Sequence, residues 1–160
     1  MLPPGAAAPD IDLPDLDGAA WTLREALRHG PVVLAFFKVS CPICQLTFPF
    51  LQRLADSPNP NSPDASPRLI AISQDDVPDS REFQQRFGVS MPTLIDARPG
   101  FSASNAYRIT SVPSIFVVET DGKITTAVEG FSRAEIEKLG QRFHVVPFLE
   151  SDRVPDQRPG

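Results

Sequence analysis

The feature that most constrains the fold is a run of six apolar residues, Val32–Phe37, with no polar residue among them. The run is too short to span a bilayer, and it fits a strand buried on both faces, as in the middle of a parallel sheet. Helix-like and strand-like patterns then alternate along the chain. This order predicts an α/β fold with a central mixed β-sheet flanked by helices on both faces.

Turn and capping signals divide the rest of the chain into short elements. Asp17-Gly18 lies between two apolar pairs and predicts an N-terminal β-hairpin. Helices are expected after capping residues that precede apolar residues at helical spacing, and strands at short apolar runs. The predicted helices are Thr22–Arg28, Pro42–Ala55, Asp79–Phe87 (with Asp79 or Ser80 as the cap), Ser102–Tyr107 and Ser132–Phe143, and the further predicted strands are Leu69–Ile72, Thr93–Ile95, Ser114–Glu119 and Lys123–Val128.

The length of 160 residues suits one domain. We expect residues 8–148 to form it, and residues 1–7 and 149–160 to be flexible ends, because few large apolar residues lie there. Residues 57–67 carry four of the 18 prolines and no large apolar side chain. We interpret them as a long loop and a neutral insertion, since long surface loops cost little free energy.

The charge and the composition of the chain limit the classes of binding partner that we expect. The net charge is −5 and no basic stripe is present, which argues against nucleic acid. No apolar run is long enough for a membrane segment. The start lacks a signal peptide, which favours the cytoplasm, while a trimmed leader would fit an extracytoplasmic location. We expect a monomer or a weak dimer.

The two cysteines form a Cys41-Pro42-Ile43-Cys44 motif where the buried strand is expected to run into a helix. The first thiol then lies at the helix N-terminus, where free N–H groups and the helix dipole favour the thiolate. The second thiol, one turn on, can attack a mixed disulfide and release the product. We therefore interpret Cys41 as the nucleophile and Cys44 as the resolving thiol.

Two plainer interpretations of the motif have less support. Buried structural cysteines would not need this placement. A structural zinc site usually needs four nitrogen or sulfur ligands, and only His29 and His144 could complete one, although neither is near in sequence. No metal and no cofactor are expected.

Several segments resemble the thioredoxin-like superfamily, in the redoxin branch shared by TlpA-like thiol–disulfide oxidoreductases and AhpC/TSA peroxiredoxins. The resemblance covers about residues 8–143. The segments are Ala8–Leu13 followed by Asp17-Gly18, Val32–Phe37 before the CxxC, Ala71–Asp76, and Val112–Val118 followed by Asp121-Gly122.

The resemblance implies a thioredoxin-like fold with the hairpin as an N-terminal extension. It also implies a cis bond between Val112 and Pro113 beside the active site, with the Val112 backbone pairing with an extended substrate segment. The residues expected to bind substrate are Ser40, Pro42, Ile43, Val112 and Pro113.

The chain departs from the pattern of these families at three positions. Ser40 stands where they usually have Trp, Ala35 where thioredoxins have a buried Asp, and Thr47 where many TlpA-like proteins have Glu. Proton transfer at Cys44 therefore needs water or another group. Lys38 lies three residues before the first thiol, where a cation would favour the thiolate unless the side chain points into solvent.

Three functions stay open at this stage. The first is thiol–disulfide exchange with protein or small-molecule thiols and disulfides. The second is peroxide reduction with Cys41 as the peroxidatic and Cys44 as the resolving thiol, although Lys38 occupies the usual Thr position and Arg108 is only a candidate for the partner Arg. The third is a non-catalytic binding module that holds partners through the groove near Pro113.

Overall fold

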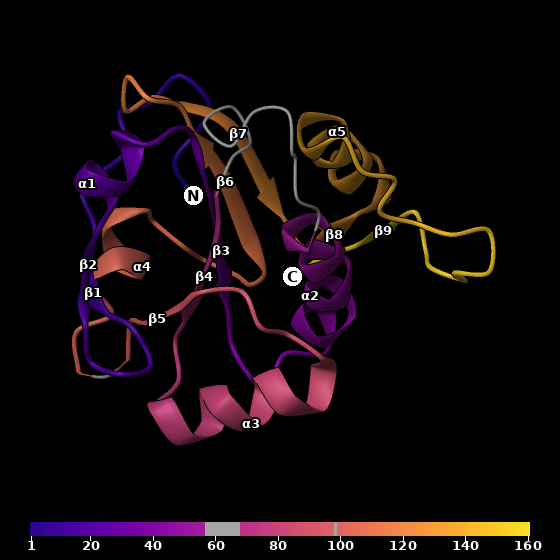
Figure 1. Ribbon diagram of the computed structural model, residues 1–160, viewed down its shortest axis with the longest axis horizontal. Coiled ribbons are helices and arrows are strands. Elements are labelled where there is room, and N and C mark those ends of the chain that lie inside the picture. Colours follow the sequence, from indigo (N-terminus) through magenta and orange to yellow (C-terminus); the bar gives the residue numbers. More distant parts are fainter. Residues whose placement is uncertain (57–67, 98) are drawn as a thin grey trace.

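The computed structural model describes residues 1–56, 68–97 and 99–160, and its centre is a five-stranded mixed sheet (Figure 1). The strand order is β5-β4-β3-β6-β7, in which β3 pairs parallel with β4 and antiparallel with β6. The strands are β3 Val32–Phe37, β4 Arg68–Ser73, β5 Thr93–Ile95, β6 Ser114–Val118 and β7 Ile124–Glu129. The predicted α/β class with a central mixed sheet is confirmed, whereas the expected loop at residues 57–67 lies outside the described residues.

Strand β3 is central, as its apolar sequence predicts, and all six of its residues are buried. Its side chains alternate between two core clusters. Val33, Ala35 and Phe37 belong to the cluster on one face of the sheet. Val32, Leu34 and Phe36 belong to the cluster on the other. A strand without polar residues can therefore be accommodated only because helices cover both faces.

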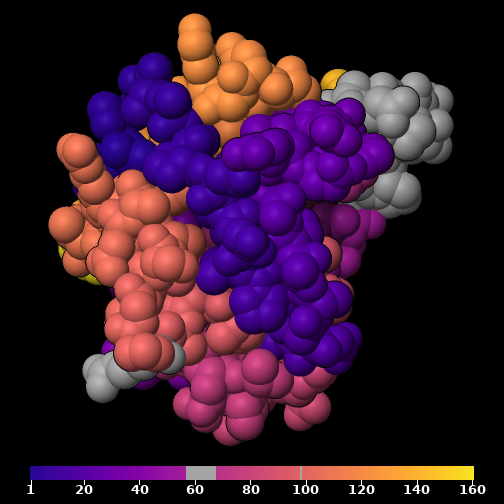
Figure 2. Space-filling model, turned by 90° about the vertical axis from the view of Figure 1, so that its left-hand side faces the viewer, coloured from indigo at the N-terminus to yellow at the C-terminus, as the bar shows by residue number. Residues whose placement is uncertain are grey.

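The helices divide between the two faces of the sheet (Figure 1). The first face is covered by α2, α3 and α5, and the second by α1, α4 and the N-terminal hairpin of β1 and β2. The bounds are β1 Asp12–Pro14, β2 Ala20–Thr22, α1 Leu23–Leu27, α2 Pro42–Ala55, α3 Val77–Phe87, α4 Ser102–Ala106 and α5 Arg133–Phe143. Figure 2 shows the second face, where the N-terminal residues run from the segment around residue 120 down toward α3.

One helix start differs from its prediction. Helix α3 begins at Val77, and its cap is Asp76, whose side chain accepts a hydrogen bond from the Asp79 N–H at 3.0 Å. The expected caps, Asp79 and Ser80, lie inside the helix. The physical reason is Pro78, because a proline in the first turn has no N–H to leave unpaired and already has a helical φ.

Both ends of the chain contact the domain, so residues 1–7 and 149–160 are not detached, although the proposed domain bounds of 8–148 stay a prediction. The Leu2 N–H donates to the Tyr107 carbonyl at 3.0 Å. At the other end, the two-residue strands β8 (Phe131–Ser132) and β9 (Gln157–Arg158) pair antiparallel. Met1, Leu2 and Ala6 also pack, half-buried, against the core cluster that contains Tyr107, and Val154 packs against the other cluster.

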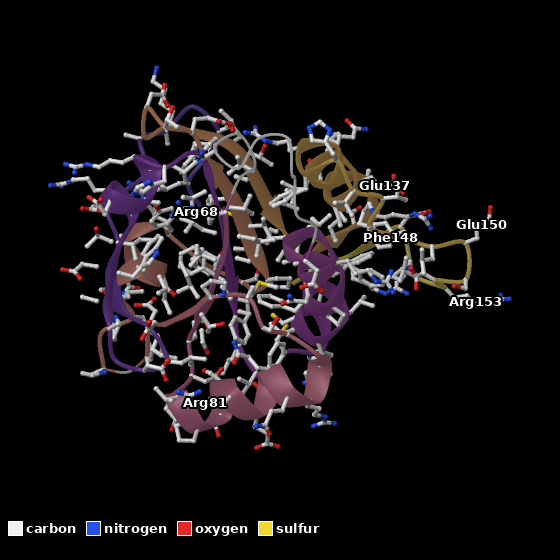
Figure 3. All side chains as sticks on the ribbon, viewed as in Figure 1. Arg68, Arg81, Glu137, Phe148, Glu150 and Arg153 are labelled. Atoms are coloured by element: carbon white, nitrogen blue, oxygen red, sulfur yellow. The ribbon has the colours of Figure 1, made fainter. Side chains whose placement is uncertain are left out.

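The loop between α5 and β9 is attached at its base. Phe148 is buried against Phe50 and Phe131. Arg53 of α2 forms an ion pair with Asp152 at 2.5 Å. Figure 3 shows Phe148 near the helices, while Glu150 and Arg153 project from the outer end of the loop.

Within the described parts of the chain, no helix combines the length and apolarity needed to cross a membrane.

Candidate active site

The dithiol lies where β3 ends and α2 begins, as the sequence predicts. Cys41 is the N-cap of α2, and its Sγ accepts a hydrogen bond from the Cys44 N–H at 3.2 Å. The Cys41 N–H donates to the Lys38 carbonyl at 3.1 Å, which closes the turn after β3. Pro42 opens the helix without leaving an N–H unpaired. The capping contact fixes the Cys41 sulfur at the N-terminus of α2, beside the first backbone N–H groups of the helix.

The two thiols are free and have different surroundings. Cys41 is half-buried, whereas Cys44 is fully buried within the core cluster under α2. Burial raises the pKa of the Cys44 thiol far above its ordinary value, and the contact with the Cys41 side chain raises it further. Cys44 therefore keeps its proton and is shielded from solvent, whereas Cys41 is accessible to a reagent.

A distant segment completes the site. The Val112–Pro113 peptide bond is cis, as the resemblance implies. The Cys41 Sγ donates to the Val112 carbonyl at 3.3 Å, although 71 positions separate the two residues. The register of the sheet explains this approach, because Phe36 near the end of β3 pairs with Ser114 at the start of β6. The residue before the proline thus lies beside the first thiol.

The other residues expected to bind substrate surround the same thiol. Ser40 and Pro42 are exposed on either side of Cys41, and Ile43 is half-buried against the core. Thr47, which stands where related proteins carry Glu, is buried, and its hydroxyl donates to the Ile43 carbonyl at 2.6 Å. Thr47 therefore bonds within its own helix and offers no acid to Cys44.

Sequence reasoning missed a carboxylate near the dithiol. Asp75 follows β4, and its Oδ2 accepts a hydrogen bond from the Val39 N–H at 2.7 Å. Its negative charge is one of the causes that raise the pKa of Cys44. The parallel pairing of β3 with β4 brings the two strand ends together, since Phe37 pairs with Ser73. The available signal was an acidic residue two positions after the end of the neighbouring parallel strand.

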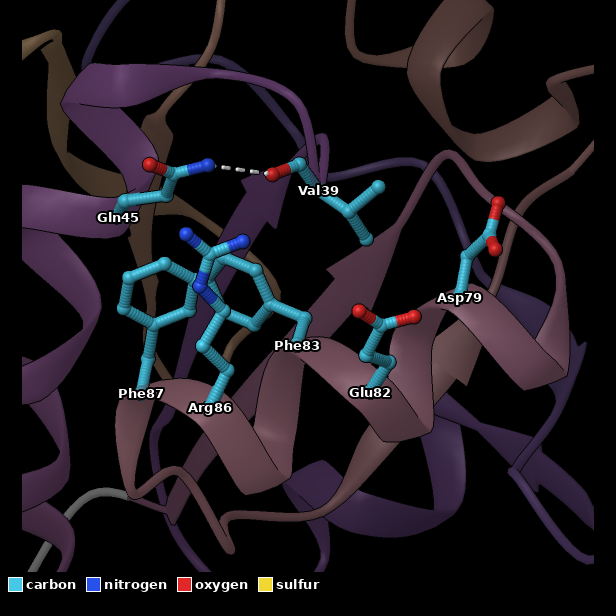
Figure 4. A pocket seen from close by; sticks show the side chains of 7 residues that line it. All are labelled: Val39, Gln45, Asp79, Glu82, Phe83, Arg86 and Phe87. Carbon is cyan, nitrogen blue, oxygen red and sulfur yellow. Dashed lines mark hydrogen bonds between the residues drawn. The ribbon is translucent and has the colours of Figure 1, made fainter.

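A hollow of about 180 Å³, open to solvent, lies between the start of α2 and α3 (Figure 4). Its apolar wall combines Val39 with Phe83 and Phe87 of α3, and the Arg86 guanidinium lies 5.4 Å from the Phe87 ring centre. Gln45 reaches across to the Val39 carbonyl at 3.0 Å. The hollow begins two residues before the first thiol and was not predicted.

The AhpC/TSA family model matches residues 4–127, which include the dithiol and the cis-proline segment. The chain belongs to the AhpC/TSA family. The chain is also similar to curated relatives. The thiol–disulfide oxidoreductase ResA of Geobacillus thermodenitrificans (strain NG80-2) is 27% identical over 79% of this chain and 69% of the relative. The ResA of Geobacillus kaustophilus (strain HTA426) is 27% identical over 84% and 74%.

Solved structures show that this AhpC/TSA member has the thioredoxin-like fold. The thioredoxin domain of a thiol–disulfide oxidoreductase from Bacteroides vulgatus has a TM-score of 0.73 and 20% identity, over 89% of this chain and 99% of that one. Peroxidoxin BcpB from Mycobacterium tuberculosis has a TM-score of 0.72 and 22% identity, over 90% and 97%. At these identities, the likeness shows the shared fold.

Two exposed residues bear on this choice within the AhpC/TSA family. Arg108 is exposed in the turn after α4, and α4 covers the sheet face opposite α2. Lys38 is exposed and lines a cavity with Asp75, Asp76 and Asp79. The candidate role of Arg108 and the expected effect of Lys38 on the first thiol both stay predictions.

Proposed function

We propose that the chain is a thiol–disulfide oxidoreductase in which Cys41 is the nucleophile and Cys44 the resolving thiol. The observation that carries the proposal is the asymmetry of the pair. Cys41 is accessible at a helix N-terminus and contacts Val112, whereas Cys44 is buried one turn behind it and donates its N–H to the Cys41 sulfur. The names of the ResA relatives support the same chemistry.

The reduction of a substrate disulfide takes place in two steps. The Cys41 thiolate attacks one sulfur of a substrate disulfide, and the other sulfur leaves as a thiolate that takes up a proton. Cys44 then gives its proton to solvent and attacks Cys41, which releases the second substrate thiol. Two electrons and two protons pass to the substrate, and a Cys41–Cys44 disulfide remains. The reverse sequence oxidises a dithiol.

Substrates are protein or small-molecule thiols and disulfides. An extended segment lies along the Val112 backbone before cis-Pro113, as in strand addition. The exposed Ser40 and Pro42 contact the residues around the attacked sulfur. Because Ser40 is small, the surface beside Cys41 leaves room for a side chain that a Trp would exclude.

Peroxide reduction is the second candidate, favoured by the family and by the structural likeness to peroxidoxin BcpB. It has less support from the site. Lys38 stands at the usual Thr position, and Arg108 is exposed in the turn after α4.

One experiment separates the functions. The reduced protein is incubated with insulin or with hydrogen peroxide, and the loss of free thiol is followed in time. Fast reduction of insulin with slow consumption of peroxide supports the proposal, and the opposite result supports the peroxidase. If neither occurs while the thiols are intact, and if the Cys41→Ser, Cys44→Ser double variant still binds its partners, the protein is a binding module.

A further inference from the structure

Residues 156–160 return from the outer loop to the edge of the active site. Gln157 pairs with Ser132 and Arg158 with Phe131. The Asp156 carbonyl accepts a hydrogen bond from the Arg133 N–H at 2.9 Å. The segment therefore runs antiparallel to the short strand that follows Gly130, whose own N–H donates to the Pro113 carbonyl at 2.8 Å.

The end of this segment lies against the residue before the cis-proline. A Cβ built on Gly160 would be 2.7 Å from the Val112 carbonyl oxygen and 3.0 Å from the Ser111 Oγ. The same carbonyl accepts the hydrogen bond from the Cys41 Sγ at 3.3 Å. The Gly160 backbone thus lies over the atom that the nucleophile contacts, and only a residue without a side chain fits there.

We propose that residues 157–160 occupy the place of a substrate backbone beside Val112, so that an extended peptide must displace them to reach Cys41. The inference rests on the proposed function and adds a competitor for its substrate. The segment already has the geometry that a substrate needs, since it is extended, antiparallel to β8 and in contact with Val112. The partner that fits this surface is an unstructured peptide whose residue opposite the Val112 carbonyl is as small as glycine.

A substrate can win this competition for a structural reason. Among the buried side-chain nitrogen and oxygen atoms of the described residues, the Ser111 Oγ is the one without a hydrogen-bond partner. Gly160 covers this hydroxyl without bonding to it. A peptide that offers a backbone N–H or carbonyl at that point gains a hydrogen bond that residues 157–160 do not make.

The segment is also weakly held. Residues 157–160 are all exposed, and β9 has two residues. Segments with few buried contacts open at a small free-energy cost. While they are closed, the apparent affinity for a peptide falls in proportion to the open fraction. The segment therefore raises the KM for peptides without altering the chemistry at Cys41.

The test compares a chain that ends at Asp156 with the full chain. The cut keeps the Asp156 carbonyl that bonds Arg133 and removes only residues 157–160. Gly160→Ala is the second variant, because its Cβ collides with the Val112 carbonyl. Gly100→Ala is the matched control, since a Cβ there meets nothing within 4 Å. The measured quantities are KM and kcat for reduction of an unstructured peptide disulfide.

We expect the KM to fall about fivefold in the shortened chain and to fall in Gly160→Ala, with kcat unchanged. The control should match the full chain. An unchanged KM in both variants, with the activity intact, overturns the inference and leaves the proposed function standing.

If none of the chains reduces a disulfide, the proposed function fails and a binding measurement decides the inference. The same peptide with Ser in place of its cysteines is titrated into both chains, and amide chemical shifts at Ser111 and Val112 are followed. Tighter binding by the shortened chain supports the competition, and equal binding contradicts it.

Discussion

Cys41 and Cys44 lie one helical turn apart and have opposite surroundings. Cys41 caps α2, is half-buried and contacts the Val112 carbonyl, whereas Cys44 is fully buried among the core residues below it. Burial raises the pKa of Cys44, and the nearby charge of Asp75 acts in the same direction. The comparison teaches that two identical side chains take different roles because the fold exposes one and buries the other.

Replacing either cysteine should have the largest effect on activity, and the two replacements should differ in kind. Cys41→Ser removes the nucleophile, and we expect kcat/KM for a disulfide to fall by about a thousandfold or more, equivalent to about 4 kcal/mol. Cys44→Ser keeps the nucleophile but cannot resolve the mixed disulfide. Mass spectrometry should then find the substrate joined to Cys41. A mixed disulfide at Cys44 of Cys41→Ser, formed at the same rate, would contradict the assignment.

Loosening the core around Cys44 should reduce the difference between the thiols. Phe48 is fully buried. Its ring centre lies 4.5 Å from that of Phe37 and 5.7 Å from that of Phe83. Phe48→Ala should lower the free energy of unfolding in urea by about 3–5 kcal/mol, through lost burial and a cavity. It should also speed alkylation of Cys44. The control is Leu149→Ala, because Leu149 is 57% exposed and its removal should change neither quantity.

The stability of the protein should depend on pH through Cys44. Its pKa is raised in the folded state, so above the ordinary thiol pKa of about 8.5 the unfolded chain releases a proton that the folded chain keeps. Stability is therefore full below about pH 8.5 and falls above it, by about 1.4 kcal/mol per pH unit.

Urea unfolding between about pH 7.5 and pH 9.5 measures this slope, a range that ends below the ordinary Tyr pKa of about 10. Cys44→Ala should remove most of the slope. The same slope in this variant would show that another group is responsible.

The smallest expected effect comes from removing the charge of Asp75, which tests how that charge acts on Cys44. Asp75→Asn keeps a side-chain oxygen for the Val39 N–H but removes the charge that disfavours the Cys44 thiolate. The pH profile of mixed-disulfide resolution should therefore move to lower pH, with a rate gain of about two- to threefold near neutral pH. Asp76→Asn is the matched control, because Asp76 caps α3 and is not among the causes that shift Cys44. A slower resolution step in Asp75→Asn would instead identify the carboxylate as a proton acceptor.

The sequence was sufficient for the parts of the site that depend on neighbouring residues. The apolar run Val32–Phe37 predicted the central strand, and the CxxC after it predicted a thiol at the start of α2. The resemblance to redoxins supplied the cis bond at Val112–Pro113, which no local pattern requires. These features follow from short-range order and from a motif with specific spacing.

The remaining parts depend on contacts between distant segments. Asp75 reaches Val39 only because β3 and β4 pair in parallel with their ends level. Residues 157–160 reach Val112 through backbone pairing with Phe131 and Ser132, in a segment without an apolar pattern. The start of α3 differs from the prediction for a local reason, because Pro78 lies in the first turn of the helix and Asp76 is its cap.

The most direct test of the account is the order in which the two thiols react. The reduced protein is treated briefly with iodoacetamide at neutral pH, digested and mapped by mass spectrometry. The account predicts that Cys41 is labelled first, because it is accessible and caps α2, while Cys44 is buried and holds its proton. Labelling of Cys44 before Cys41 would contradict the central claim.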